Sequence, residues 1–292
     1  MKKKISLSII ILAIVFVSGC VQIPGGFGGG SGGVAIESFE PDFSTVYSGE
    51  QIQLRLLLRN TGSRDATNVR TTLTIFGESN DFCNEAKLLA ADPEMGISGE
   101  TKSCTYTVES GAPELPEKLS VTYTPSVRVE YGYSTVTVKS IAVGSYQELR
   151  KIKDIGGTIP TETITSTKSP VSLNIIAKGP VRVYDDSTVF PMEIVVSNTG
   201  GGVVCNGDCN AEDNWNEIDV VIEPISDIIN IENCDTVEEI SLFKGKSNTI
   251  GCKLRIDEPD TLGAIEALIK ASAKYNYFVD ASTQIKVTGI ED

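Results

Sequence analysis

A set of short markers occurs twice in this sequence in the same order, and this repetition limits the possible folds more than any other feature. The offsets are 138 residues for an Asn-Thr-Gly turn, 148 residues for a cysteine and 144 residues for a Tyr-x-Tyr pair. Several markers in one order at nearly constant spacing indicate a tandem duplication. The recurring segments are residues 60–62 and 198–200, residues 99–108 and 245–256, and residues 131–133 and 275–277.

Each copy has the pattern of short strands and turns. In residues 51–60, apolar side chains alternate with polar ones, which is typical of a half-buried strand. Asn-Thr-Gly then supplies a turn, because Asn and Gly tolerate positive φ. Copies of roughly 110 to 120 residues built in this way have the size of an immunoglobulin-like sandwich. We therefore predict an all-β fold with two tandem immunoglobulin-like β-sandwich domains, residues 34–145 (copy 1) and residues 170–290 (copy 2).

One segment has conflicting signals. Residues 261–275 place apolar side chains at helical spacing and contain good helix formers. Their counterpart in copy 1, residues 118–133, alternates as a strand and contains Pro125. Because the repeat is stronger evidence than local propensity, we predict a strand in both copies.

The connection between the copies covers residues 146–169. Its first part, residues 146–154, can form a short helix with Leu149 and Ile152 facing inward. Its second part is rich in Thr, Ser and Pro, which is typical of an extended linker. We therefore expect the two domains to be able to move relative to one another.

The N-terminus has the pattern of an export signal. Residues 1–20 contain three lysines, an apolar run and small residues that end at Cys20. The segment Val17-Ser-Gly-Cys20 resembles a lipobox, in which the cysteine carries the lipid; the alternative is an uncleaved anchor. Residues 21–33 are rich in Gly and predict a flexible spacer. Both readings place the remaining chain on the extracellular side of the cell membrane, attached through its N-terminus.

Four segments of copy 1 resemble CARDB-type domains, which are immunoglobulin-like modules of prokaryotic, including archaeal, surface proteins. The resemblance covers residues 35–143 well and residues 171–287 less well. It implies a fold together with a role in adhesion or as a structural spacer, and it transfers no catalytic residues. The segments are Glu37-Ser-Phe-Glu-Pro-Asp42, Tyr47-Ser-Gly-Glu50, Arg59-Asn-Thr-Gly62 and Ala66-Thr-Asn-Val69.

Six cysteines remain after Cys20, and an even number on an exported chain predicts a disulfide framework. Cys83 and Cys104 are the two cysteines of copy 1, and Cys234 and Cys252 hold the matching places in copy 2. Each of these bridges should stabilise the fold by about 3 kcal/mol. The last pair, Cys205 with Cys209, would close a tight ring inside an insertion, residues 203–217, that copy 1 lacks.

The insertion is also a weak candidate for a calcium loop. Counting from Asn206, oxygen-bearing side chains fall at positions 1, 3, 5, 7, 9 and 12. Two departures weaken the match, since position 1 is Asn and position 6 is Ala211 where Gly is expected. Trp215 in this loop is either a buried lid or an exposed contact for a partner. The candidate ligands are Asn206, Asp208, Asn210, Glu212 and Glu217, with Asn214 at position 9.

Composition excludes several functions. The chain has no His, so Ser-His-Asp or Cys-His nucleophile systems and most catalytic zinc sites cannot form. A net charge of −14 argues against nucleic acid. We expect a non-enzymatic, membrane-anchored surface protein without a cofactor, which acts in adhesion, in envelope structure or as a subunit of a surface assembly by binding a protein or an envelope polymer. The alternatives are a ligand- or Ca²⁺-binding surface lipoprotein that uses the insertion and, less favoured, a hydrolase with paired carboxylates.

Overall fold

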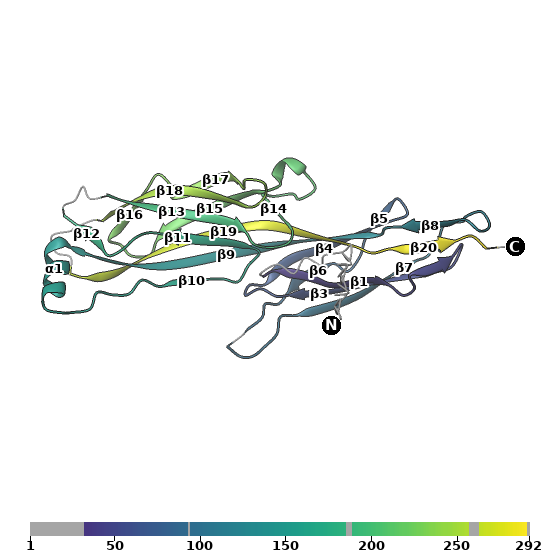
Figure 1. Cartoon of the computed structure of the whole chain (residues 1–292), viewed down its shortest axis with the longest axis horizontal. Helices are drawn as coiled ribbons and strands as arrows, with labels where there is room; N and C mark the ends of the chain where they lie inside the picture. Colours follow the sequence, from purple (N-terminus) through teal and green to yellow (C-terminus); the bar gives the residue numbers. More distant parts are fainter. Residues whose placement is uncertain (1–31, 93, 185–188, 257–262, 291–292) are drawn as a thin grey trace, which may run out of the picture.

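The computed structural model describes residues 32–92, 94–184, 189–256 and 263–290. The predicted signal, Cys20 and most of the Gly-rich spacer lie outside this range. Within it the protein is all-β with several sheets, one α-helix and one short 3₁₀-helix, and it is elongated (Figure 1). No helix in the described ranges is long and apolar enough to cross a membrane.

The strands of copy 1 are short except for the last one. They are β1 (Val34–Pro41), β2 (Thr45–Tyr47), β3 (Ile52–Asn60), β4 (Ala66–Ile75), β5 (Glu78–Asp81), β6 (Glu85–Leu88), β7 (Thr101–Val108), β8 (Ser120–Tyr123) and β9 (Ser126–Ser145).

The connection contains α1 (Tyr146–Asp154), which spans the residues predicted to be helical, and β10 (Ile164–Ser166). Copy 2 also has one long strand near its end, which a short strand follows. Its elements are β11 (Val171–Ile176), β12 (Val181–Val183), β13 (Val189–Asn198), β14 (Val203–Cys205), η1 (Glu212–Asn214), β15 (Glu217–Pro224), β16 (Ile229–Glu232), β17 (Thr236–Ser241), β18 (Ser247–Ile256), β19 (Ile265–Ser282) and β20 (Ile285–Thr288).

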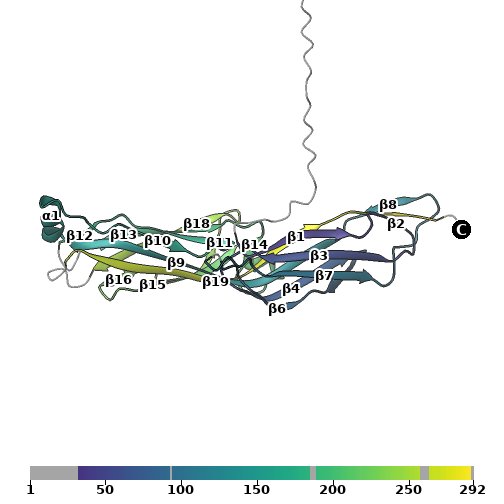
Figure 2. The same cartoon turned by 90° about the horizontal axis from the view of Figure 1, so that it is seen from below.

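One long sheet runs through both copies. Its two central strands, β9 and β19, pair antiparallel over their whole length, from Ile265 opposite Val143 to Ser282 opposite Ser126. A small sheet of β1, β3 and β7 lies in one half of the molecule, and a sheet of β11, β13, β18 and β16 lies in the other (Figure 2). The apolar side chains between the long sheet and these two sheets form one continuous core.

The two copies are therefore not independent sandwiches joined by a loose linker. Strand β20, at the end of copy 2, pairs with β2 and β8 of copy 1. The predicted linker contributes β10, which pairs with β9. Hydrogen-bonded strands cross the expected domain boundary, and relative motion of two halves would break these ladders. The prediction of a loose linker rested on the local composition of residues 146–169. In the folded chain, part of this segment pairs with β9, and this pairing fixes its conformation.

The ribbon of β9 and β19 gives the duplication a pseudo-twofold axis. Tyr131 pairs with Tyr277, and Tyr133 pairs with Tyr275. The repeat equates Tyr131 with Tyr275 and Tyr133 with Tyr277, so each pair maps onto the other. The axis passes through the Gly132–Asn276 pair that lies between them. Segment 265–275 is a strand, as the repeat predicts, because it must match β9 across this axis.

The Asn-Thr-Gly turns have the same hydrogen bonds in both copies. The Asn60 side chain accepts from the Gly62 N–H at 3.1 Å and donates to the Arg64 carbonyl at 2.8 Å. The Asn198 side chain accepts from the Gly200 N–H at 3.2 Å and donates to the Gly202 carbonyl at 3.0 Å. The hydroxyl groups of Tyr133 and Tyr277 form hydrogen bonds with these turns, so the turn motif and the Tyr-x-Tyr motif contact each other in both copies.

Four tyrosines fill the centre of the core, with neighbouring ring centroids 5.8 to 6.5 Å apart. The Tyr133 hydroxyl accepts from the Arg64 N–H at 3.1 Å. The Tyr277 hydroxyl accepts from the Gly202 N–H and donates to Asn198, both at 2.9 Å. Rings at these positions are core residues, which satisfy their polar ends by bonding the backbone of the turns.

The two halves differ at the remaining two hydroxyls. The Tyr275 hydroxyl lies 2.9 Å from Thr135 Oγ1 and accepts from the Val171 N–H. The Tyr131 hydroxyl is buried and has no hydrogen-bond partner among the described residues. The nearby Val34 N–H lowers the pKa of Tyr131, but it is not placed to form a hydrogen bond with the hydroxyl. The repeat offset of 144 explains this, because it places Val279 where copy 1 supplies Thr135.

Val279→Thr is therefore expected to stabilise the protein. The new hydroxyl would stand beside the Tyr131 hydroxyl as Thr135 stands beside Tyr275, and one satisfied buried group is worth about 1 kcal/mol. Val127→Thr is the matched control, because Val127 faces the same core and is 1% exposed. That change should cost about 1 to 2 kcal/mol by burying a hydroxyl without this partner. Denaturant unfolding of both variants measures the difference, and equal losses would refute the assignment.

Three disulfides join the predicted pairs, two of which correspond between the copies, while the third was the pair left over. Cys83–Cys104 ties β7 to the segment after β5, with Cα atoms 5.8 Å apart. Cys234–Cys252 ties β18 to the segment before β17, with Cα atoms 5.6 Å apart. The third bridge, Cys205–Cys209, lies in the insertion.

Candidate functional site

The insertion in copy 2, residues 203–217, forms a compact knob on the long sheet. Its first strand, β14, pairs with residues 276–278 of β19. The Cys205–Cys209 disulfide closes its turn, with Cα atoms 5.4 Å apart. The Asn276 side chain holds the knob from below by donating to the Gly207 carbonyl at 2.6 Å. The knob is therefore fixed to the ribbon at the pseudo-twofold axis.

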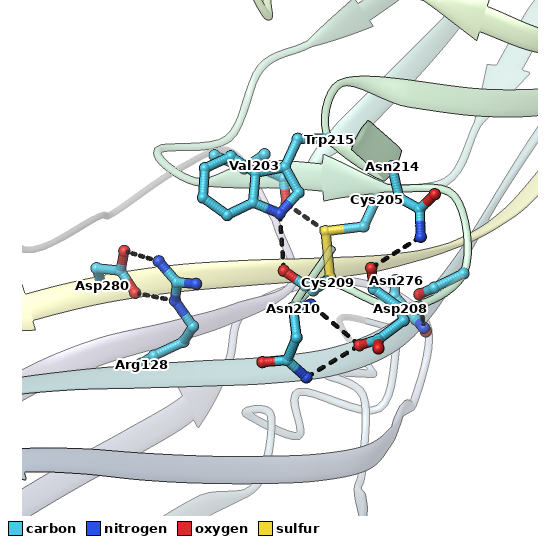
Figure 3. The surroundings of a disulfide bond; sticks show 11 residues. Arg128, Val203, Cys205, Asp208, Cys209, Asn210, Asn214, Trp215, Asn276 and Asp280 are labelled. Atoms are coloured by element: carbon cyan, nitrogen blue, oxygen red, sulfur yellow. Dashed lines mark hydrogen bonds and ion pairs between the residues drawn. A yellow bond between two sulfur atoms is a disulfide. The ribbon is translucent and has the colours of Figure 1, made fainter. Parts of the chain in front are cut away.

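Trp215 acts as the lid of this knob, which is one of the two roles predicted for it. Its indole N–H donates to the Cys209 carbonyl at 2.7 Å. Its ring packs on Phe278 with centroids 5.2 Å apart. It lies beside the Cys205–Cys209 disulfide, whose cysteines are at most 1% exposed (Figure 3). The side chain is half-buried, and its packing is accounted for within the protein.

Most of the candidate calcium ligands make side-chain hydrogen bonds within the protein, while Glu212 is exposed in η1. Asn206 donates to Asp219 at 3.1 Å, and Asp208 accepts from both the backbone and the side chain of Asn210. Glu217 accepts from Ser241, away from Asp208. In the described ranges, no three His, Cys, Asp or Glu side chains form a group that could hold a metal ion. The loop contains η1 and is closed by the Cys205–Cys209 disulfide, and calcium binding by it stays a prediction.

An ion pair borders the knob on the outer face of the sheet. Arg128 on β9 makes two hydrogen bonds to the Asp280 carboxylate on β19, at 2.8 and 2.9 Å. The guanidinium carbon lies 3.9 Å from the centroid of Phe278 and 5.5 Å from that of Trp215. The hydrogen bonds to Asp280 raise the pKa of Arg128. Arg128 therefore fixes one edge of the knob by pairing and by stacking (Figure 3).

Glu130, the next outward residue of β9, has an altered acidity. Burial raises the pKa of its carboxyl group, and the negative charge of Asp208 adds to this effect. Arg70 and Arg128 act in the opposite direction. The net direction is upward, so the protonated form of Glu130 is favoured relative to an exposed carboxyl group.

Three hollows follow one another along this outer face. The first, of about 470 Å³, lies beside the knob and is lined by residues of β4, β5, β9 and β19 and by Asn210. The second, of about 440 Å³, lies at the pseudo-twofold axis. The third, of about 570 Å³, lies on β15, β9 and β19 and shares Ser134 and Lys274 with the second. We call this row of hollows the trough.

The two end hollows are related by the pseudo-twofold axis. Thr72 pairs with Arg128 in the first, and Val221 pairs with Ser272 in the third. The offset of 144 residues equates Arg128 with Ser272. The duplication therefore produced two related surfaces. The knob borders the first hollow through Asn210 and contributes no residue to the third.

Sequence reasoning pointed to the knob and missed the trough. The signal was present, because the inward residues of β9 alternate with outward Arg128 and Glu130. Such residues look like an ordinary solvated strand face until the pairing of β4, β9, β19 and β15 places them in a row.

Comparisons with known proteins do not identify a family. No protein-family model matches the chain, and no curated protein matches it. Among solved structures, it is similar to the sporulation control protein Spo0M from Bacillus subtilis with 10% identity and a TM-score of 0.18. That match covers 79% of this chain and 93% of the other one, and at this TM-score it carries no argument. The resemblance to CARDB-type domains stays a prediction.

Proposed function

We propose that this protein is a non-enzymatic, membrane-anchored protein of the extracellular surface, with two fused immunoglobulin-like sandwiches that present the trough to a macromolecular partner. It acts in adhesion, in envelope structure or as a subunit of a surface assembly. The observation that carries the proposal is the trough itself. It is a long surface on rigid strands, bordered by a disulfide-closed knob that is held by Arg128 and Asn276.

Two further features support a binding role. The first is the export-type N-terminus with Cys20, followed by a Gly-rich spacer. The second is chemical: the chain has no His, and carboxylates of the trough such as Asp280 and Glu223 pair with cations. Carboxylates paired in this way hold neighbouring strands together, which fits a binding surface.

Crosslinking on intact cells tests the binding role. A photoreactive side chain placed at Thr74 or Ser272, at the two ends of the trough, should capture a partner. The same group at Thr249, an exposed residue of β18 in a small sheet, is the matched control. Equal capture at all three positions, or none at any of them, would contradict the proposal.

Cys20→Ser is expected to release the protein from the membrane. Only a thiol can carry the thioether-linked lipid, so serine removes the anchor while it leaves the folded part unchanged. Fractionation of cells into membrane and soluble material, followed by immunodetection, measures the change. Retention of the variant in the membrane fraction would show that the apolar segment itself is the anchor.

A further inference from the structure

We propose that the partner bound in the trough is a polysaccharide of the cell envelope that carries no net charge. This inference rests on the proposed function and specifies the chemistry of the partner. It follows from the side chains that line the trough, from their charge balance and from their placement on one sheet face.

Hydroxyl groups line both ends of the trough. Thr72, Thr74 and Ser126 face the first hollow, and Ser134 and Ser272 face the third. The Thr72 hydroxyl donates to Asp81 at 2.9 Å and the Thr74 hydroxyl lies 3.1 Å from Ser79 Oγ, and each of these hydroxyls keeps a lone pair that can accept a further hydrogen bond. A hydroxyl both donates and accepts hydrogen bonds, as the hydroxyls of a sugar do. Carboxylates and guanidinium groups among them add pure acceptors and pure donors. A surface with this mixture matches a chain of sugar hydroxyls in any local orientation.

The charges of the trough nearly cancel, although the whole chain has a net charge of −14. The cationic side chains are Arg64, Arg70, Arg128, Lys270 and Lys274. The anionic side chains are Asp65, Asp81, Glu130, Asp219, Glu223 and Asp280.

Several of these charges are already neutralised by each other. Arg128 pairs with Asp280 at 2.8 Å, and Lys270 pairs with Glu223 at 2.8 Å. A polyanion would meet no excess of cations here, and the acidic remainder of the protein would repel it. A polycation would be attracted to the acidic surface of the whole protein and would not bind selectively in the trough. The charge balance therefore favours an uncharged partner.

The length of the trough favours a polymer over a small ligand. From Ser126 to Val136 the strand β9 advances ten residues, which corresponds to about 33 Å. Each hollow alone has a volume within the range of small-ligand pockets, about 300 to 1,000 Å³, and three of them lie in one row. Most of the lining residues lie on paired strands, so little conformational entropy is lost when a chain is bound.

An extended peptide fits this surface less well. Peptides that bind sheets add to an exposed edge, where free backbone N–H and C=O groups give the affinity. The trough lies on a face, where the backbone groups of β9 are already used by β4 and β19. The largest aromatic group nearby, Trp215, is half-buried and packs on Phe278, and its indole N–H is used by the Cys209 carbonyl.

Binding to delipidated envelopes, prepared from cells that produce the protein, tests the inference. Full-length protein is added in a detergent without a sugar headgroup, to envelopes that are untreated, protease-treated or oxidised with periodate, which cleaves vicinal diols. Binding should survive protease and fall at least tenfold after periodate. The variant T72V/T74V/S126A, which removes three hydroxyls with little change in shape, should bind at least tenfold more weakly. The control T101V/T105V, on exposed residues of β7 in the small sheet, should bind as the unaltered protein does.

The other outcomes separate the inference from the proposed function. Binding that is lost after protease and kept after periodate means a protein partner, which overturns the polysaccharide and leaves the proposed function standing. Binding that responds to periodate but is unaffected by T72V/T74V/S126A places the sugar elsewhere and also overturns the inference. No binding to untreated envelopes contradicts both.

Discussion

Raising the pH above about 10 should unfold this protein in one cooperative step, because four tyrosines are buried together at its centre. Burial raises the pKa of Tyr133 and of Tyr277 to about 12. Burial also raises the pKa of Tyr131 and of Tyr275. An unfolded chain ionises its tyrosines near pH 10. Between these two pKa values the unfolded state loses protons that the folded state retains.

The sign and size of the effect follow from this difference. A folded pKa above the unfolded one gives a contribution to stability that is complete below pH 10 and is lost as the pH rises toward the folded pKa. At pH 11 Tyr133 and Tyr277, whose folded pKa is about 12, have each lost about 1.4 kcal/mol. Together they remove about 3 kcal/mol, and the raised pKa of Tyr131 and of Tyr275 adds to the loss in the same direction. The total stability of a typical domain is only about 5 to 15 kcal/mol.

Ultraviolet absorbance of tyrosinate, followed together with circular dichroism, measures the transition. Of the nine tyrosines, the buried four should ionise only as the β signal disappears. Tyr277→Phe should reduce the pH dependence of the unfolding free energy by about one proton, whereas Tyr47→Phe, at a residue that is 51% exposed, should leave it unchanged. Ionisation of all nine tyrosines with the β signal intact would show that the cluster is open to solvent.

Sequence alone could predict the elements of this fold because their signals are local. The Asn-Thr-Gly turns, the Tyr-x-Tyr strands and the cysteine pairs repeat, and each copy supports the interpretation of the other. The repeat even overrode the helical propensity of residues 265–275, which form part of β19. Local patterns that agree in two places are strong evidence for one structure.

The arrangement of the copies could not be predicted in this way. A repeat states which residues are equivalent and says nothing about how the copies pack. The 20-residue length of β9 was the available clue, since a mean strand has about 5 to 6 residues. Its alternation continues past Tyr133 through Thr135 and Thr137, which are buried, with Val136 and Val138 on the opposite face, beyond what one sandwich requires. The trough is formed by the pairing of β9 with β19, so it could not be predicted from the sequence either.

Gly62→Ala is expected to destabilise the protein by about 3 to 5 kcal/mol. A methyl group at this position would overlap the hydroxyl oxygen of Tyr133, and it would lie 2.7 Å from the Gly33 nitrogen and 2.9 Å from the Lys168 carbonyl oxygen. The Tyr133 ring cannot retreat, because Tyr131 and Tyr275 pack against it. The variant therefore loses the bond from the Arg64 N–H to Tyr133 and also disturbs the packing of the core.

The pseudo-twofold axis predicts the same result at the matching turn. A methyl group at Gly200 would overlap the hydroxyl of Tyr277 and lie 2.9 Å from its Cζ atom. Gly251 provides the control, because a methyl group there meets no atom within 4 Å. Gly251→Ala should leave the free energy of unfolding unchanged or raise it by a few tenths of a kcal/mol. Denaturant unfolding of the three variants compares these sites directly.

A double-mutant cycle identifies the cause of the Gly62 effect. Tyr133→Phe removes the overlapping oxygen and should itself cost about 1 kcal/mol, the value of its hydrogen bonds. If the hydroxyl excludes the methyl group, Gly62→Ala combined with Tyr133→Phe should cost at least about 1 kcal/mol less than the sum of the two single changes. Some cost must remain, because the backbone atoms of Gly33 and Lys168 still crowd the new methyl group. Strictly additive energies would mean that the Tyr133 hydroxyl does not exclude the methyl group. Glycine and tyrosine would then occur at these positions in both copies for separate reasons.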